Sequence, residues 1–486
     1  MSVPVPTSAP GPRRRLLILA ICCTSLLIVS LDATVLNVAL PSIRRELGTS
    51  VTGLQWIIDA YTLVLASLLV LAGSTADRIG RRKVFLTGLA LFTLGSALCS
   101  LAPDLPLLVV FRMVQAVGGS MLNPVAMSII TNTFTDPRER ARAIGAWGGV
   151  VGISMAAGPV VGGLLVGTVG WRSVFWLNIP VGLVALLLTW RYVPESRAPK
   201  PRRPDPVGQV LVIALLGSVT YAIIEAPSQG AAVLPLAGVA VAALAGLLLY
   251  EPRRAEPLID LRFFRSAPFS GATVIAVSAF AALSGFLFLN TLYLQGTRGL
   301  SPLDAGLYML PMAGLTFVCA PLSGRLVGAR GPRLPLIVAG ATMAASGLLF
   351  AAFAAESSTP LLFTAYVLFG LGFGTVNAPI TNTAVSGMPR AQAGVAAAIA
   401  STSRQTGSTL GVAVIGSVLA AGTSATAPAS TFLAASRPAW WIITACGLAV
   451  LAVGAATSGE WARETARRTA ERLERTGARV VARSGS

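Results

Sequence analysis

The chain has 486 residues, of which 54% are hydrophobic and only 12% are charged. Because soluble domains carry about a quarter of charged residues, this composition excludes an ordinary water-soluble protein. The net charge of +18 sits in short basic clusters between apolar runs, which favours the loops of a membrane protein over a nucleic-acid-binding surface.

Apolar stretches long enough for a membrane-spanning helix recur along the whole chain. They fall near residues 16–40, 54–75, 84–102, 106–132, 143–168, 173–193, 207–226, 231–250, 268–295, 303–323, 334–355, 360–380, 392–421 and 439–458. Only α-helices supply every backbone hydrogen bond internally across so many apolar segments, and the alternation typical of barrel strands is not seen. The sequence therefore predicts an all-α polytopic membrane protein with about fourteen transmembrane helices.

An even number of spans places both termini on the same side of the membrane. With the N-terminus in the cytoplasm, roughly 30 arginines and lysines fall in cytoplasmic segments and about 5 in external loops, as the positive-inside rule expects. Residues 71–82 also align with residues 322–333 without a gap, which indicates two duplicated halves. We therefore expect a cytoplasmic N-terminus at 1–15, a six-helix bundle at 16–193, two extra helices with basic linkers at 194–267, a second six-helix bundle at 268–458 and a basic cytoplasmic tail at 459–486.

Ionisable side chains interrupt the apolar runs of the first half at Asp32, Asp59 and Arg112. A charge at bilayer depth costs roughly 2.5–3.5 kcal/mol, so such residues tend to face a cavity or to pair with one another. A buried carboxylate takes up a proton readily, whereas a guanidinium keeps its charge. We expect a switch in which deprotonated Asp32 attracts Arg112 and protonated Asp32 releases it. The alternative is an acid that reaches water at the interface and an arginine with a purely structural bond.

Two further motifs predict moving parts. The cytoplasmic loop after the second span combines glycines, an acid and arginines at Gly73, Asp77, Arg78, Gly80, Arg81 and Arg82. This pattern predicts a tight turn with a salt bridge at a helix end, which we expect to latch two bundles together. The fifth span carries Gly158, Pro159, Gly162 and Gly163. Small residues allow close helix packing and proline bends the helix, so a rocking element is expected, with packing alone as the alternative.

These residues resemble the major facilitator superfamily, in its fourteen-helix drug:proton antiporter branch. The loop at 73–83 is similar to the signature between helices two and three, and Arg112 with Gln115 to the fourth-helix motif. The stretch 158–163 resembles the fifth-helix motif of antiporters. The stretches 31–41 and 171–180 resemble signatures of the fourteen-helix branch, so the likeness covers nearly the whole chain.

The resemblance implies a major-facilitator-like fold of two six-helix bundles plus two extra central helices, working by alternating access. It implies that Asp59 is similar to the second-helix aspartate of quaternary-ammonium efflux pumps, which supports recognition of cationic drugs. The expected substrate site comprises Asp59, Asp32, Trp56, Tyr61 and Gln115, and Asp32 with Arg112 is expected to couple protons. Those pumps carry a further acid in the second half, whereas this chain has none deep in its later spans, which puts divalent cations in doubt.

The expected function is a proton-coupled antiporter that exports drugs, antibiotics or other amphipathic or cationic organic compounds across a bacterial inner membrane. Its expected partners are small organic substrates, protons and the lipid bilayer, with no nucleic acid, and it is expected to work as a monomer. The alternative is a proton-coupled importer of a small organic solute on the same fold.

Enzymatic and ATP-driven functions are not expected. Histidine is absent, and the five cysteines lie inside apolar runs without metal-ligand spacing, so no metal site is predicted. Neither lysine, Lys83 or Lys200, precedes a serine or threonine, as a phosphate-binding loop requires. We therefore expect no cofactor and a proton gradient as the driving force.

Overall fold

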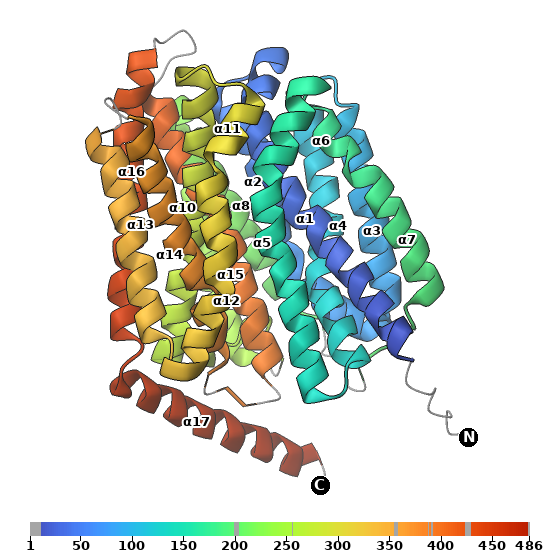
Figure 1. The fold of residues 1–486 in the computed structure, drawn as a ribbon. Coiled ribbons are helices and arrows are strands. Elements are labelled where there is room, and N and C mark those ends of the chain that lie inside the picture. Colours follow the sequence, from blue (N-terminus) through green and yellow to red (C-terminus); the bar gives the residue numbers. More distant parts are fainter. Residues whose placement is uncertain are drawn as a thin grey trace.

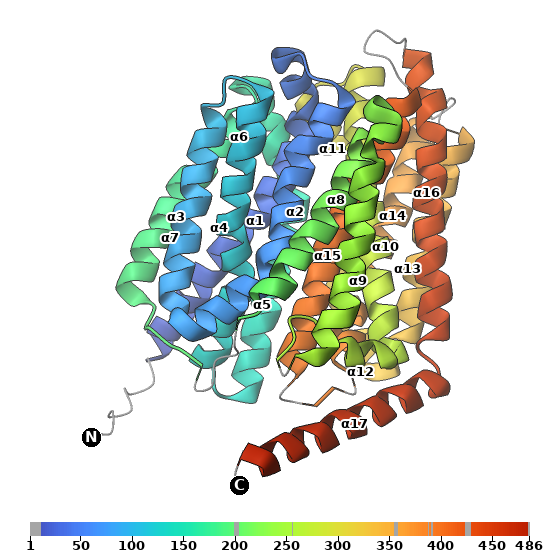
Figure 2. The ribbon, with the colours of Figure 1, turned by 180° about the vertical axis from the view of Figure 1, so that it is seen from behind.

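A computed structural model shows a bundle of long, roughly parallel helices (Figures 1 and 2). It describes residues 11–198, 204–254, 256–353, 358–386, 388–389, 392–422 and 429–484. No strand occurs in these ranges, and helices take up nearly all of them. Parts of the predicted segments, at 1–10, 199–203, 255, 354–357, 387, 390–391, 423–428 and 485–486, lie outside the described residues.

The helices follow one another with short connections. The first half contains α1 (Pro12–Leu47), α2 (Val51–Ile79), α3 (Arg81–Ser100), α4 (Leu105–Thr133), α5 (Pro137–Thr168), α6 (Ser173–Trp176) and α7 (Asn178–Tyr192). The middle contains α8 (Pro206–Gln229), η1 (Gly230–Val233), α9 (Leu234–Tyr250), η2 (Glu251–Arg253) and η3 (Leu261–Arg265). The second half contains α10 (Ala267–Leu292), η4 (Tyr293–Thr297), α11 (Pro302–Tyr308), α12 (Leu310–Arg330), α13 (Arg333–Phe353), α14 (Thr359–Val385), α15 (Ala393–Gly422), α16 (Ala429–Ala456) and α17 (Glu460–Ser484).

The predicted number of spans is confirmed. In the described part of the chain, 13 helical segments are long and apolar enough to cross a membrane. One of them, the 48-residue segment Pro206–Arg253, contains both α8 and α9, so 13 segments hold fourteen crossing helices. The predicted span 303–323 instead breaks into α11 and α12 at Met309, because Pro311 has no backbone N–H to continue the first helix.

The chain packs as two halves with the extra helices beside them. In the first half, α3 packs on α4 and α7, and α1 packs on α4, α5 and α7. In the second half, α13 packs on α14 and α16, and α10 packs on α14, α15 and α16. Helix α8 packs on α9 and also on α2 and α15, so it lies over the seam between the halves (Figure 2). This arrangement confirms two six-helix bundles plus two extra helices, while the residue boundaries of the predicted domains stay a prediction.

The two ends of the bundle differ. Helix α1 begins at the same end of the bundle at which α17 lies, and we call this end the termini side (Figure 1). The opposite end is the distal side. Contacts between the halves lie toward the distal side, where the Gln295 amide donates to the Val38 carbonyl at 2.9 Å. The halves therefore touch toward the distal side.

Helix α17 runs along the termini side under the second half (Figure 2). Its Thr465 hydroxyl accepts the Ala267 backbone N–H at 3.0 Å, and Leu473 is buried against Phe263 and Phe269. On its outer face Arg468 donates to Glu464 at 2.9 Å, and this hydrogen bond lowers the pKa of that carboxyl. The tail is thus a surface helix docked on the second half.

Candidate functional site

A buried ion pair lies at the centre of the first half. Arg112 Nη1 on α4 donates to Asp32 Oδ2 on α1 at 2.6 Å, and each side chain is 1% exposed. The other carboxylate oxygen accepts from Gln115 Nε2 at 2.9 Å and from Asn178 Nδ2 at 2.8 Å. Asp32 Oδ2 therefore accepts from the guanidinium and Oδ1 from two side-chain amides, so both carboxylate oxygens have partners.

The guanidinium of Arg112 has partners beyond Asp32. It donates to the Gln115 side-chain oxygen at 2.7 Å and to the Ile57 carbonyl at 3.3 Å. The Tyr61 ring lies 4.1 Å from its Cζ, within the range of a cation–π contact. A buried ion pair offsets the cost of desolvation only when its remaining donors and acceptors are also satisfied, and this network largely meets that condition.

Close helix packing positions the network. A Cβ added at Gly95 of α3 would come 2.6 Å from Gln115 Cα, and one added at Gly118 of α4 would come 2.6 Å from the Gly88 carbonyl. Only glycine permits α3 and α4 to approach this closely, which brings Gln115 against the interior of the half.

Asn178 joins the network at the first residue of α7, where its amide also donates to Ser96 Oγ at 3.0 Å. From the sequence, Asn178 was expected only as part of the stretch 171–180 that resembles a signature of the fourteen-helix branch, with no role in the site. Its signal was an amide inside an apolar run, which is weaker than a charge because a neutral amide costs less to bury.

Asp59 lies apart from this network. Its side chain is fully buried, and Oδ1 accepts only a long hydrogen bond of 3.4 Å from the Thr62 hydroxyl. Its Oδ2 atom has no hydrogen-bond partner among the described residues. Thr62 in turn accepts from Thr409 of α15 at 2.9 Å, so this carboxyl lies at the contact between the two halves.

The other predicted substrate residues are divided between two places. Tyr61 and Gln115 belong to the Asp32 network. The Trp56 indole instead donates to Glu225 of α8 at 2.8 Å, and its ring lies 5.5 Å from Tyr221. Trp56 therefore joins α2 to the extra helix, a contact that the sequence did not predict.

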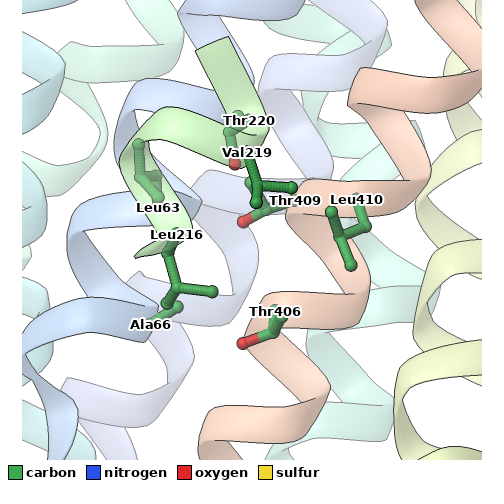
Figure 3. Close-up of a pocket in the computed structure, with 8 residues that line it drawn as sticks. All are labelled: Leu63, Ala66, Leu216, Val219, Thr220, Thr406, Thr409 and Leu410. Atoms are coloured by element: carbon green, nitrogen blue, oxygen red, sulfur yellow. The ribbon is translucent and has the colours of Figure 1, made fainter. Parts of the chain in front are cut away.

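An apolar pocket of about 200 Å³ opens one turn of α2 beyond Asp59, between α2, α8 and α15 (Figure 3). It is lined by Leu63, Ala66, Leu216, Val219, Thr220, Thr406, Thr409 and Leu410. In Figure 3 the side chains from α8 and α15 point toward one another across it. The Thr409 hydroxyl on its wall connects it through Thr62 to the buried carboxyl.

The loop between α2 and α3 is held by the linker that follows α7. Arg81 bonds Asp77 at 2.9 Å, as the predicted turn requires, and the Ala198 N–H donates to the Asp77 carbonyl at 3.0 Å. Gly80 has φ of +132°, a conformation that favours glycine, and Arg82 N donates to the Glu195 carboxylate at 3.1 Å. Gly73 and the exposed Arg78 lie just before this turn. These bonds join the loop to residues at the end of the first half.

The glycines of α5 face two different neighbours. A Cβ added at Gly158 would collide with Thr34 of α1, and one added at Gly162 would come 3.1 Å from Val35. One added at Gly163 would come 2.6 Å from Leu303 Cα of α11, in the second half. Pro159 lies inside the helix between them. Helix α5 is thus in backbone contact with its own half and with the other.

Two helical halves that cross a membrane, with a buried ion pair in one of them, define a secondary transporter. Residues 22–412 match the family model of the Major Facilitator Superfamily, and the chain belongs to this family. The resemblance drawn from its motifs is therefore confirmed. The family consists of multi-span membrane transporters, which agrees with a non-enzymatic role.

Relatives extend this assignment. The multidrug resistance protein Stp of Mycobacterium tuberculosis is 39% identical over 417 residues, which cover 85% of this chain and 78% of that protein. The tetracenomycin C resistance and export protein of Streptomyces glaucescens is 39% identical over 398 residues, covering 81% and 74%. A crystal structure of a bacterial homologue of the human lysosomal transporter Spinster, in an inward-facing and occupied conformation, has a TM-score of 0.67 to this chain at 17% sequence identity. The match covers 95% of this chain and 98% of that chain, which shows a shared fold.

Proposed function

We propose that this protein is a proton-coupled antiporter that exports drugs, antibiotics or other amphipathic organic compounds by alternating access. The observation that carries the proposal is the sealed Asp32–Arg112 pair, 2.6 Å apart, in a chain whose relatives are named as resistance and export proteins. A carboxyl that can bind a proton, held against a cation that cannot lose one, is a minimal device for coupling protonation to a change of contacts.

The orientation proposed is the one that the positive-inside rule favours. The termini side, with Arg78, Arg81 and Arg82 in its first loop, faces the cytoplasm of a bacterial plasma membrane, and the distal side faces outward. The hydrogen bonds of Gln295 and Gln55 between the halves then lie toward the outside in this conformation. We propose that the domains run as the sequence predicts, from 16–193 and 268–458 for the two bundles, and that a monomer suffices.

In the proposed cycle, opening of the distal side exposes Asp32 to external protons. Protonation removes its negative charge, so Arg112 keeps only Gln115, the Ile57 carbonyl and the Tyr61 ring as partners. The weakened contact between α1 and α4 allows the halves to rock back, and release of the proton to the cytoplasm restores the ion pair. The Gly158–Gly163 face of α5 and the loop around Asp77 are the proposed moving contacts.

Asp59 is the proposed recognition site for cationic groups. A buried carboxylate without a counter-ion gains a strong electrostatic partner when an ammonium group arrives. The apolar pocket one turn away, lined on three helices, suits the apolar body of such a compound. On the same helix Trp56 contacts α8 and Tyr61 packs on Arg112.

The test is dye efflux from cells that lack their own drug pumps, comparing wild type with Asp32→Asn, with and without an uncoupler. Export that stops with the uncoupler and is lost in the variant supports proton coupling through Asp32. Efflux that is unchanged by the substitution would remove Asp32 from the mechanism.

The importer alternative is distinguished in the same cells. Energised cells that express an importer accumulate the solute, whereas cells that express an exporter lose it. Uncoupler-sensitive accumulation in wild-type cells would replace the proposal.

A further inference from the structure

The second half contains a half-buried arginine that has no acidic partner among the described residues. Arg404 of α15 donates through Nη2 to the Thr381 hydroxyl of α14, and its buried Nε atom has no hydrogen-bond partner in the part of the chain that the structure describes. None of the ion pairs among the described residues includes it. Arg112 in the first half, by contrast, has a carboxylate at 2.6 Å. No described acidic residue therefore neutralises the positive charge of Arg404.

The depth of Arg404 separates it from lipid headgroups. It lies eleven residues after Ala393, where α15 begins, which is about 16 Å along the helix axis at 1.5 Å per residue. Inside a span, an arginine is normally paired, bonded to backbone carbonyls or turned to a water-filled cavity. With one hydroxyl as its hydrogen-bond partner, Arg404 fits the last of these situations.

The surroundings of Arg404 suit an aromatic anion. The Phe280 ring of α10 lies 6.0 Å from the guanidinium carbon, at the limit of a cation–π contact. Thr381 is exposed, and Asn377 lies one turn earlier on the same face of α14. These side chains provide a cation, a hydroxyl and an amide around one aromatic surface. Backbone contact of Gly407 with Val277 fixes the distance between α15 and α10.

We propose that Arg404 binds the carboxylate or phenolate of an aromatic substrate, with Phe280 against its ring. This inference rests on the proposed export function and extends its substrates from cationic to acidic aromatic compounds. A guanidinium presents paired donors that match a carboxylate, and both groups are bonded more strongly where water is scarce. Asp59 in the first half and Arg404 in the second then select opposite charges in one transporter.

Binding to the purified full-length protein, in a zwitterionic detergent, tests this separately from transport. The probes are fluorescein, an aromatic carboxylate and phenolate, and ethidium, an aromatic cation, each followed by fluorescence anisotropy. The variants are Arg404→Gln and Arg404→Lys. Arg437→Gln is the matched control, because Arg437 lies in α16 of the same half and donates to a backbone carbonyl, that of Ala351.

We expect Arg404→Gln to raise the Kd of fluorescein by about tenfold to hundredfold, since a charged hydrogen bond of this kind is worth about 1.5–3 kcal/mol. Arg404→Lys keeps the charge and is expected to restore part of the affinity. Ethidium binding, and fluorescein binding to Arg437→Gln, are expected to stay within about twofold of wild type.

Two results would overturn the proposal. Fluorescein that binds wild type and Arg404→Gln equally, or not at all, excludes Arg404 as an anion site. Equal loss of both probes in Arg404→Gln assigns it a structural role. Failure of export in cells, with the fluorescein difference intact, contradicts the proposed function and leaves this site standing.

Discussion

The two halves treat their central polar residues differently. Arg112 lies six residues before Gly118 in the first half, and Tyr366 lies six residues before Gly372 in the second, near the same place of the repeat. Tyr366 donates its hydroxyl to Asn290 at 2.9 Å, a neutral hydrogen bond in the place where the first half has an ion pair. The titratable member of the repeat therefore lies in the first half, and proton coupling is expected there.

Removing either member of the ion pair is expected to destabilise the protein by about 3–5 kcal/mol, because the remaining charge is buried and uncompensated. Thermal unfolding of the purified Arg112→Gln and Asp32→Asn variants measures the loss of stability. Unchanged stability in either variant would contradict a stabilising role for the pair.

Asp59→Asn is expected to weaken export of cationic dyes by at least about tenfold, because an ion pair in a water-poor site is worth more than 1.4 kcal/mol. Export of neutral drugs is expected to stay unchanged, since the amide has the shape of the carboxylate. The concentrations of matched cationic and neutral compounds that inhibit growth of cells expressing wild type or Asp59→Asn measure this difference. Glu225→Gln, which removes an acid from α8, serves as the control. Parallel loss for both compound classes would show that Asp59 is structural.

At the level of single residues, the sequence predicted the pairing of Asp32 with Arg112 because unpaired charges in an apolar run are costly. It did not predict that Trp56 bonds to Glu225, nor that Tyr61 lies under the guanidinium. Those contacts depend on which face of α2 meets α8 and α4. Because these apolar helices have polar residues on several faces, the sequence pattern alone does not determine the orientation.

Among the helices, α5 makes the contact on which rocking would depend. Its Gly158 and Gly162 pack on α1, while Gly163 packs on Leu303 of α11. The second half contributes Gly306, where an added Cβ would come 2.7 Å from the carbonyl carbon of Pro159. Small residues on both sides thus let two backbones touch across the boundary between the halves.

Gly163→Ala is expected to push α11 away from α5 and to shift the equilibrium toward the state open on the distal side. Its Cβ would come 2.6 Å from a backbone carbon, which cannot move aside as a side chain can. Gly148→Ala in the same helix is the control, since its Cβ meets nothing within 4 Å. Spin-label distances across the distal side measure the shift. Equal distances in both variants would mean that this contact does not limit closure.

The sequence predicted the positions of the helices better than the breaks within them. Apolar length places each span, so α8 at Pro206–Gln229 and α15 at Ala393–Gly422 begin and end close to the predicted limits. The breaks before Leu310 and Asn178 were not predicted. Hydrophobicity is continuous across both positions, so apolar length misses the breaks; the sequence signal for the first is Pro311.

At the scale of the molecule, the contacts describe one end state of a rocking cycle. The halves meet on the distal side, where Gln295 reaches Val38, and the Gln55 amide of α2 donates to the Ala413 carbonyl at 2.8 Å. Helix α8 spans the same seam, with Gln209 bonded to the Ser67 carbonyl and the Ile223 carbonyl bonded to Ser417. Helix α8 therefore touches both halves, and rocking requires α8 to slide against at least one of them.

Charge balance provides the last prediction. One proton entering for each monocation leaving moves no net charge, so a membrane potential should leave ethidium export unchanged and only a pH gradient should drive it. One proton entering for each monoanion leaving moves two charges in the same direction, and each is worth about 2.3 kcal/mol per 100 mV.

Proteoliposomes with imposed potassium diffusion potentials separate these cases at a fixed pH gradient. A potential that is negative on the side into which the protons move should accelerate export of an aromatic monoanion and leave ethidium export constant. Ethidium export that also responds to the potential would require more than one proton per cycle. In that case Asp59, the other buried carboxyl of the first half, is the candidate for the second proton, because its Oδ2 atom has no partner among the described residues.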